Sequence, residues 1–117
     1  MLTLRLLGEF EVVRDGKRVP LPPSRRTRAL LAYLALTGRR HRRDRLCALL
    51  WDVPDDPKGA LRWSLSKLRG VVDEPDRPRI LADREAVAFE PAGAEIDVLR
   101  LREVVSRGLE GLNLPTL

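Results

Sequence analysis

The sequence predicts one α+β domain, in which short strands are followed by three helices, a β-hairpin and a further helix. Two patterns indicate this order. Apolar residues alternate in strand fashion near residues 2–21 and 80–89, and between these segments they recur at helical spacing. With 117 residues, of which 44% are hydrophobic, the chain is long enough to bury roughly two-thirds of its surface around one core.

The N-terminal segment is expected to form a small antiparallel sheet. Apolar side chains alternate along the first strand and its continuation, at Leu2, Leu4, Leu6, Phe10 and Val12. Asp15 and Gly16 suit a tight hairpin turn, because both central residues of such a turn need positive φ. Val19 and Leu21 return as a short strand, and prolines at positions 20, 22 and 23 end the pairing because proline has no N–H to donate.

The first helix is expected to follow Ser24, a good N-cap residue, and to end at Gly38. Its apolar stripe has the spacing i, i+1, i+4, i+5 and consists of Leu30, Leu31, Leu34 and Ala35. A basic connector at residues 39–42 then leads to the second helix.

The second helix spans about two turns and is expected to place its apolar side chains in the core. These are Leu46, Leu49, Leu50 and the closing Trp51. Its N-terminus is weakly capped, because Arg42 stands where a hydroxyl or carboxylate is usual, although Asp44 in the first turn favours the helix dipole.

The third helix has the clearest start, with Asp56 as the cap and Pro57 at the first helical position, and it runs to about Val72. At about 100° per residue, its apolar residues form one narrow stripe, consisting of Leu61, Leu65, Leu68 and Val72. The opposite arc carries small, cationic and aromatic residues, namely Gly59, Trp63, Ser66, Lys67 and Gly70, with Arg62 and Arg69 on one shoulder.

Residues 80–82 and 87–89 bracket a polar turn at residues 83–86 and predict a second hairpin. After Pro91, Asp97 is expected to cap a fourth helix that stops near Gly108. This helix has more apolar surface than a terminal helix usually exposes, at Val98, Leu101, Val104, Val105 and Leu109. We therefore expect it to dock on the domain or on a further domain downstream.

Three short helices followed by a hairpin is the element order of a winged helix-turn-helix. The charge distribution fits a polyanion partner: residues 17–72 hold 14 Lys and Arg against 4 Asp and Glu, whereas residues 73–117 carry a net charge of −4. No apolar run has the roughly 20 residues of a membrane span, the start lacks a secretory signal, and Cys47 has no second cysteine to pair with. These features favour a cytoplasmic protein.

The arc opposite the buried stripe of the third helix is the candidate DNA-binding face. Glycine and serine give it a low profile, cations can bind phosphates or guanine, and an apolar surface can contact thymine methyl groups. The alternative is that these cations are simply solvated and that Trp63 is partly buried in the core. For the whole set, the element order favours DNA binding.

Four segments resemble the actinobacterial antibiotic regulatory protein (SARP) family. They are LTLRLLGEFEV at residues 2–12, SRRTRALLAYL at 24–34, RLCALLW at 45–51 and ALRWSLSKLR at 60–69, the last resembling the recognition helix of the family. The resemblance covers about residues 2–90 and implies an OmpR/PhoB-type winged-helix DNA-binding domain over residues 1–91. Residues 92–117, with IDV at 96–98, resemble a linker and the start of a truncated bacterial transcriptional activation domain.

The resemblance also implies roles for individual residues. Base-facing positions fall on Arg62, Trp63, Ser66 and Lys67, a backbone-facing position on Arg69, and the wing tip on Arg84. We add Arg25, Arg26, Arg42 and Arg43 as phosphate contacts on the basis of charge. Family members commonly bind direct repeats, which implies a dimer on DNA, and the loop at residues 52–56 can contact RNA polymerase.

No catalytic residue, metal ligand set or cofactor motif is predicted, because the chain has no phosphate-binding glycine loop and only one His and one Cys. Cys47 is interpreted as a small buried hydrophobe, and His41 as a loop residue facing solvent or phosphate. The alternative function is a protein-interaction winged helix that docks on RNA polymerase or a partner domain through Trp63 and the acidic loop. Recognition of single-stranded nucleic acid is disfavoured by an aromatic content of only 4%.

Overall fold

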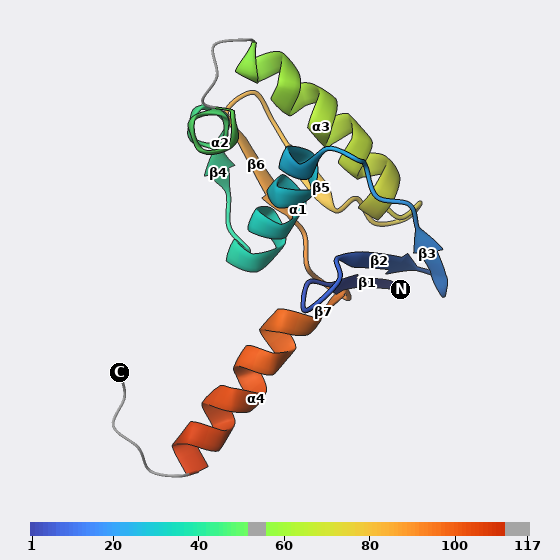
Figure 1. Cartoon of the computed structure of the whole chain (residues 1–117), viewed down its shortest axis with the longest axis vertical. Helices are drawn as coiled ribbons and strands as arrows, with labels where there is room; N and C mark the ends of the chain where they lie inside the picture. The colour runs from blue at the N-terminus through green and yellow to red at the C-terminus, as the bar shows by residue number, and fades with distance from the viewer. Residues whose placement is uncertain (52–55, 112–117) are drawn as a thin grey trace.

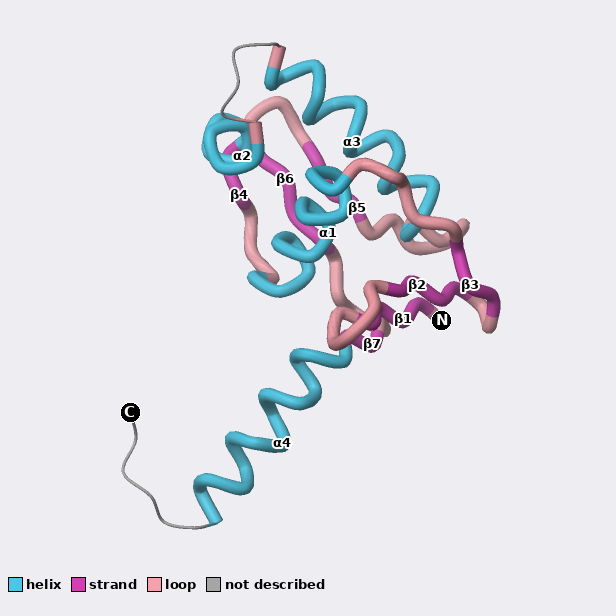
Figure 2. Tube along the Cα trace, in the orientation of Figure 1, coloured by secondary structure: helices cyan, strands magenta, loops and turns pink. Residues whose placement is uncertain are grey.

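The computed structural model describes residues 1–51 and 56–111. In these ranges the chain forms an α+β domain with four helices, one mixed sheet and one antiparallel sheet (Figure 1, Figure 2). None of the described helices is long and apolar enough to cross a lipid bilayer. The two sheets and helices α1 to α3 enclose one hydrophobic core.

The N-terminal sheet is built from β1 (Leu2–Arg5), β2 (Glu11–Arg14) and β3 (Lys17–Val19), which pair antiparallel in that order. The expected tight turn is confirmed, with φ of 53° at Asp15 and 78° at Gly16. The short β7 (Glu95–Ile96) adds to the other side of β1 in parallel, which the sequence analysis did not predict. Leu21 was expected in the third strand but lies beyond the sheet, because β3 ends at Val19.

Helix α1 (Arg25–Thr37) has both expected ends. The N–H of Thr27 donates to the Ser24 hydroxyl at 3.3 Å, and Gly38 adopts φ of 61° while its N–H donates to the Leu34 carbonyl. The predicted apolar stripe is buried.

The predicted connector after α1 is wrong in part, because it contains β4 (His41–Arg42), which pairs with β6. Helix α2 (Arg43–Leu50) follows at once, and Arg42 at its N-cap position provides no side-chain cap, as expected. Leu46 is buried, but Leu49 is 57% exposed, so its expected place in the core is wrong. An eight-residue helix buries only the face turned toward its neighbours, and Leu49 lies off that face.

Helix α3 (Pro57–Val72) packs through the predicted stripe, and all four of its residues are at most 2% exposed. The Asp56 carboxylate caps the helix by accepting the N–H of Gly59 at 3.1 Å. Ser64 is also buried, and its hydroxyl is satisfied by a hydrogen bond with the Thr27 hydroxyl of α1 at 2.8 Å. The exposed side of α3 is therefore fixed by burial of the opposite side.

The expected second hairpin consists of β5 (Ile80–Ala82) and β6 (Ala86–Phe89) and is joined by a three-residue loop. Together with β4 it forms the antiparallel sheet, in the order β4-β6-β5.

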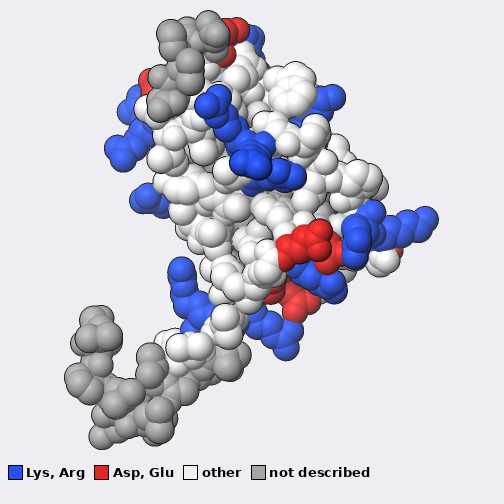
Figure 3. Space-filling model, in the orientation of Figure 1, with Lys and Arg blue, Asp and Glu red and all other residues white. Residues whose placement is uncertain are grey.

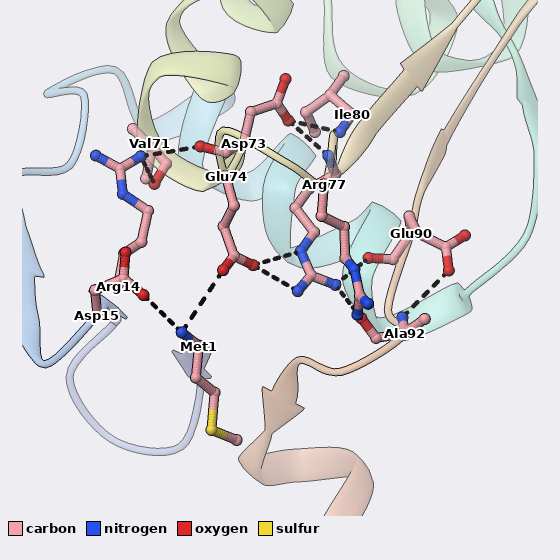
Figure 4. Close-up of polar contacts among 11 residues, drawn as sticks. Met1, Arg14, Asp15, Val71, Asp73, Glu74, Arg77, Ile80, Glu90 and Ala92 are labelled. Carbon is pink, nitrogen blue, oxygen red and sulfur yellow. Dashed lines mark hydrogen bonds and ion pairs between the residues drawn. The ribbon is translucent and has the colours of Figure 1, made fainter.

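A polar network ties the C-terminal end of α3 to both sheets (Figure 4). Arg79 is 1% exposed, pairs with Glu74 at 2.6 Å and donates to the carbonyls of Glu90 and Ala92. Arg14 of β2 donates to main-chain carbonyls at the end of α3, at residues 70, 71 and 73. The orientation of α3 is thereby set by polar contacts as well as by apolar packing.

Helix α4 (Asp97–Gly111) begins at Asp97 and ends later than the predicted stop at Gly108. The Asp97 carboxylate accepts the N–H groups of Leu6 and Leu7, at 2.8 and 3.1 Å, and so ties the start of the helix to the end of β1. Beyond its first turn the helix extends away from the body, with Leu101 and Val105 about half exposed (Figure 1). Docking of these residues on the domain is therefore not observed, and the side chains of Val104 and Leu109 lie outside the described residues.

Candidate nucleic-acid interface

The outward face of α3 carries every residue predicted to face DNA bases. Arg62, Ser66 and Lys67 are exposed, and Trp63 is 50% exposed. Arg69, predicted to face the DNA backbone, is exposed on the same helix. Figure 1 shows α3 at the outer edge of the three-helix body.

Small residues form the crest of this face. At about 100° per residue, Gly59, Ser66 and Gly70 lie next to Trp63 on the arc opposite the buried stripe, with cations on both sides of that arc. A Cβ on Gly59 would collide with the Asp56 cap at 2.2 Å, which explains that glycine within the fold. A Cβ on Gly70 would meet no atom within 4 Å, so the packing of the described chain gives no reason for a glycine there.

One flank of the crest presents an indole with a cation above it. The Nζ atom of Lys67 lies 5.4 Å from the centroid of the Trp63 ring, within the range of a cation–π contact. Trp63 and Lys67 border a hollow shared with Val71 and the proline segment at residues 20–23. This flank combines an apolar surface and a positive charge.

The other flank borders a hollow of about 340 Å³ between α2, α3 and the loop of the β5–β6 hairpin. Its lining brings together three predicted site residues from separate elements, Arg43, Arg62 and Arg84. Lys58 also lines it and was missed in the sequence analysis, although its spacing of i, i+4 from Arg62 places the two on one side of the helix.

The remaining predicted phosphate contacts lie on other elements. Arg25 and Arg26 are exposed in the first turn of α1, and Arg42 is exposed in β4. Arg43 is only half-buried, and its guanidinium Nε already donates to the Asp83 carbonyl at 2.8 Å.

Ion pairs do not neutralise the cations of α3. Among the described residues, the paired arginines are at positions 5, 18, 40, 79 and 100, and Arg62, Lys67 and Arg69 form no ion pair. Figure 3 shows the largest acidic patch of the face in view level with the N-terminal sheet, and basic side chains both beside this patch and over the helical body. The charge of the α3 cations is therefore not cancelled by ion pairs within the described residues.

His41 is not a solvent-facing loop residue, and that expectation is wrong. It is 8% exposed, its Nε2 bonds the Thr37 hydroxyl at 2.6 Å, and its ring centroid lies 4.7 Å from that of Tyr33. Burial, followed by the nearby Arg39 and Arg45 charges, lowers the pKa of His41 below 6.5. His41 belongs to β4 and so lies in the second sheet. The run of arginines around it gave no sign of a strand.

Burial raises the pKa of the Cys47 thiol, consistent with the prediction that it packs as a small hydrophobe. Within the described part of the chain, no three His, Cys, Asp or Glu side chains come together as a metal site would need.

Neither a scan against protein-family models nor a search of curated proteins gives a match for this chain. The function is therefore argued from the geometry of the site. The predicted polymerase contact at residues 52–56 falls, except for Asp56, outside the described residues.

Proposed function

We propose that this protein binds double-stranded DNA sequence-specifically and regulates transcription. In this proposal the domain is a winged helix-turn-helix, with α3 in the major groove and the β5–β6 hairpin near the adjacent minor groove. The observed element order is compatible with that fold. The observation that carries the proposal is the free Trp63–Lys67 side of α3, held outward by complete burial of the opposite stripe.

The dimensions and chemistry of the helix suit a groove. An α-helix is about 10–12 Å wide with its side chains, and the major groove of B-DNA is about 12 Å wide. Ser66 and Gly70 keep the profile low beside Trp63, and Arg62 and Lys67 lie on either side, where they can reach base edges. Arginine and lysine favour guanine O6 and N7, and the indole of Trp63 offers an apolar surface to thymine methyl groups.

Phosphate contacts complete the proposed interface. They are assigned to Arg25, Arg26, Arg42, Arg43, Arg69 and Arg84. Such contacts position the protein without discriminating between sequences. Binding to direct repeats as a dimer, contact with RNA polymerase through residues 52–56 and a cytoplasmic location belong to the same proposal.

Fluorescence anisotropy with a short duplex tests the proposal. Six phosphate contacts predict a slope of about −5 for the logarithm of the binding constant against the logarithm of the salt concentration. Arg25→Ala and Arg26→Ala should weaken binding to all duplexes and each reduce the magnitude of that slope by about one. Arg100→Ala is the matched control, because Arg100 lies on α4 and pairs with Glu95. Binding without salt dependence, or no binding at low salt, contradicts the proposal.

The half-exposed Trp63 supports a second candidate, a surface for a partner protein such as RNA polymerase. The two functions differ in their response to DNA. A protein-binding domain leaves random duplex unbound at low salt, and Trp63→Ala then removes only the protein contact.

A further inference from the structure

The loop of the β5–β6 hairpin is bound to the start of α2. The N–H of Arg43 donates to the Glu85 carbonyl, and Nε of the same residue donates to the Asp83 carbonyl, both at 2.8 Å. Immediately before these contacts, Arg42 of β4 pairs with Ala86 of β6. The loop is therefore held from outside by the first residue of a helix.

The carboxylate of Asp83 also fixes the loop from within. Its Oδ1 accepts the N–H groups of Glu85 and Ala86, each at 2.8 Å, and its Oδ2 accepts Nη2 of Arg40 at 2.5 Å. The main-chain N–H of Asp83 donates to the Ala86 carbonyl at 3.0 Å. One exposed side chain thus closes the turn and joins it to the segment before β4.

These contacts determine the shape of the loop more than the stability of the fold. The side chains of Asp83 and Arg40 are 56% and 66% exposed, so solvent weakens their ion pair. Hydrogen bonds from the N–H groups of Ala86 and Glu85 hold the pKa of Asp83 below its usual range, so the carboxylate is charged at neutral pH. A loop whose conformation is already fixed loses little entropy when a ligand binds.

Arg84 lies between the fixed residues, at the tip of this loop. It is exposed and lines the hollow that Lys58 and Arg62 of α3 also line. Arg43 and Asp44 of α2 line the hollow as well, so the site holds four cations from three elements and one acid. Four cations against one acid around one hollow favour an anion the size of a phosphate group.

We infer that Asp83 is a positioning residue, which fixes the hairpin loop so that Arg84 and Lys58 bind a backbone phosphate of the bound DNA in the hollow that Arg62, assigned to a base edge, also lines. The inference rests on the proposed function. Removal of Asp83, although it removes a negative charge, is therefore expected to weaken binding to DNA.

A double-mutant cycle on duplex binding tests the inference. Asp83→Ala should weaken binding about as much as Arg84→Ala, roughly tenfold for one charge-assisted contact. Because Asp83 acts only through Arg84, the double variant should bind no more weakly than Arg84→Ala alone. Asp83→Asn keeps an oxygen for the two turn bonds and should lose less affinity than Asp83→Ala. If Asp83→Ala binds as tightly as the wild type, or if the two losses multiply, the inference is overturned.

Amide hydrogen exchange gives a readout that does not require DNA. Asp83→Ala should speed exchange at Arg43, whose N–H donates to the Glu85 carbonyl, and at Ala86, whose N–H donates to Asp83 Oδ1. Exchange at Leu65 and Leu68 of α3 should stay unchanged. Unchanged exchange at Arg43 and Ala86 overturns the inference that Asp83 fixes the hairpin loop. If the wild type binds no duplex while the exchange result holds, the proposed function fails and the positioning of the loop stands.

Discussion

At the scale of single residues, Gly70 lies on the exposed side of α3 at a position where the packing of the described chain does not require glycine. A requirement of the binding partner would explain the glycine. Glycine within a helix costs about 0.5–1 kcal/mol relative to alanine, and the described chain leaves open space where its Cβ would lie. We therefore expect Gly70→Ala to raise the unfolding free energy by about that amount in thermal melts. The same substitution should weaken duplex binding, because the added methyl group lies on the crest that enters the groove. If Gly70→Ala bound the duplex as tightly as the wild type or more tightly, the crest of α3 would not contact DNA.

His41 makes stability depend on pH in a predictable direction. Its folded pKa lies below the unfolded value of about 6.5, so the unfolded chain binds a proton first as the pH falls. The stabilisation is present above pH 6.5 and is lost as the pH falls through the folded pKa. The thermal midpoint should therefore drop between pH 7.5 and 5.5. The chain has one histidine, so His41→Gln should flatten this dependence; a slope that survives the substitution has another origin.

At the scale of elements, sequence patterns predicted what local chemistry dictates. The caps at Ser24 and Asp56, the turn at Asp15 and the buried stripe of α3 are all observed. Tertiary pairing was harder to predict. Strand β4 has two residues in a run of arginines, so its partner in β6 left no periodic signal. Leu49 was wrongly predicted to be buried, because the spacing of apolar residues does not determine how much of the helix surface is buried.

The candidate site shows the same division. Its members on α3 follow from helical periodicity, and Lys58 could have been found by the same rule. The convergence of Arg84 with Arg62, and the engagement of Arg43 by the hairpin, depend on how distant elements meet. No pattern within one element contains that information.

The N-terminal cap of α3 should matter to the stability of the element that carries the site. Asp56→Ala removes the bond to the Gly59 N–H and should cost about 0.5–2 kcal/mol in chemical denaturation. Asp56→Gly should cost less, because Asp56 has φ of 40°, a conformation that glycine adopts without strain. If both substitutions cost the same, the backbone conformation at this residue has no influence on the cap.

At the scale of the whole molecule, the ion pair between buried Arg79 and partly exposed Glu74 links the segment after α3 to the carbonyls of Glu90 and Ala92, which follow β6. Arg79→Met leaves the carboxylate of Glu74 without its main partner, and the carbonyls of Glu90 and Ala92 without their donor, and should lower the unfolding free energy. Combining Arg79→Met with Glu74→Leu should recover much of that loss, since an apolar pair leaves no charge unpaired. Urea denaturation measures both; a double variant less stable than Arg79→Met would show that the carboxylate has a separate role.

Selection of bound sites from a random duplex library tests most directly whether the free side of α3 recognises DNA sequence. The wild type should enrich one motif, and Arg62→Ala and Lys67→Ala should each lose preference at one or two of its positions, at a cost of about 1–3 kcal/mol on the selected site. Arg100→Ala should enrich the same motif as the wild type. A library that stays random with the wild-type protein, or a motif unchanged in both α3 variants, would contradict the account.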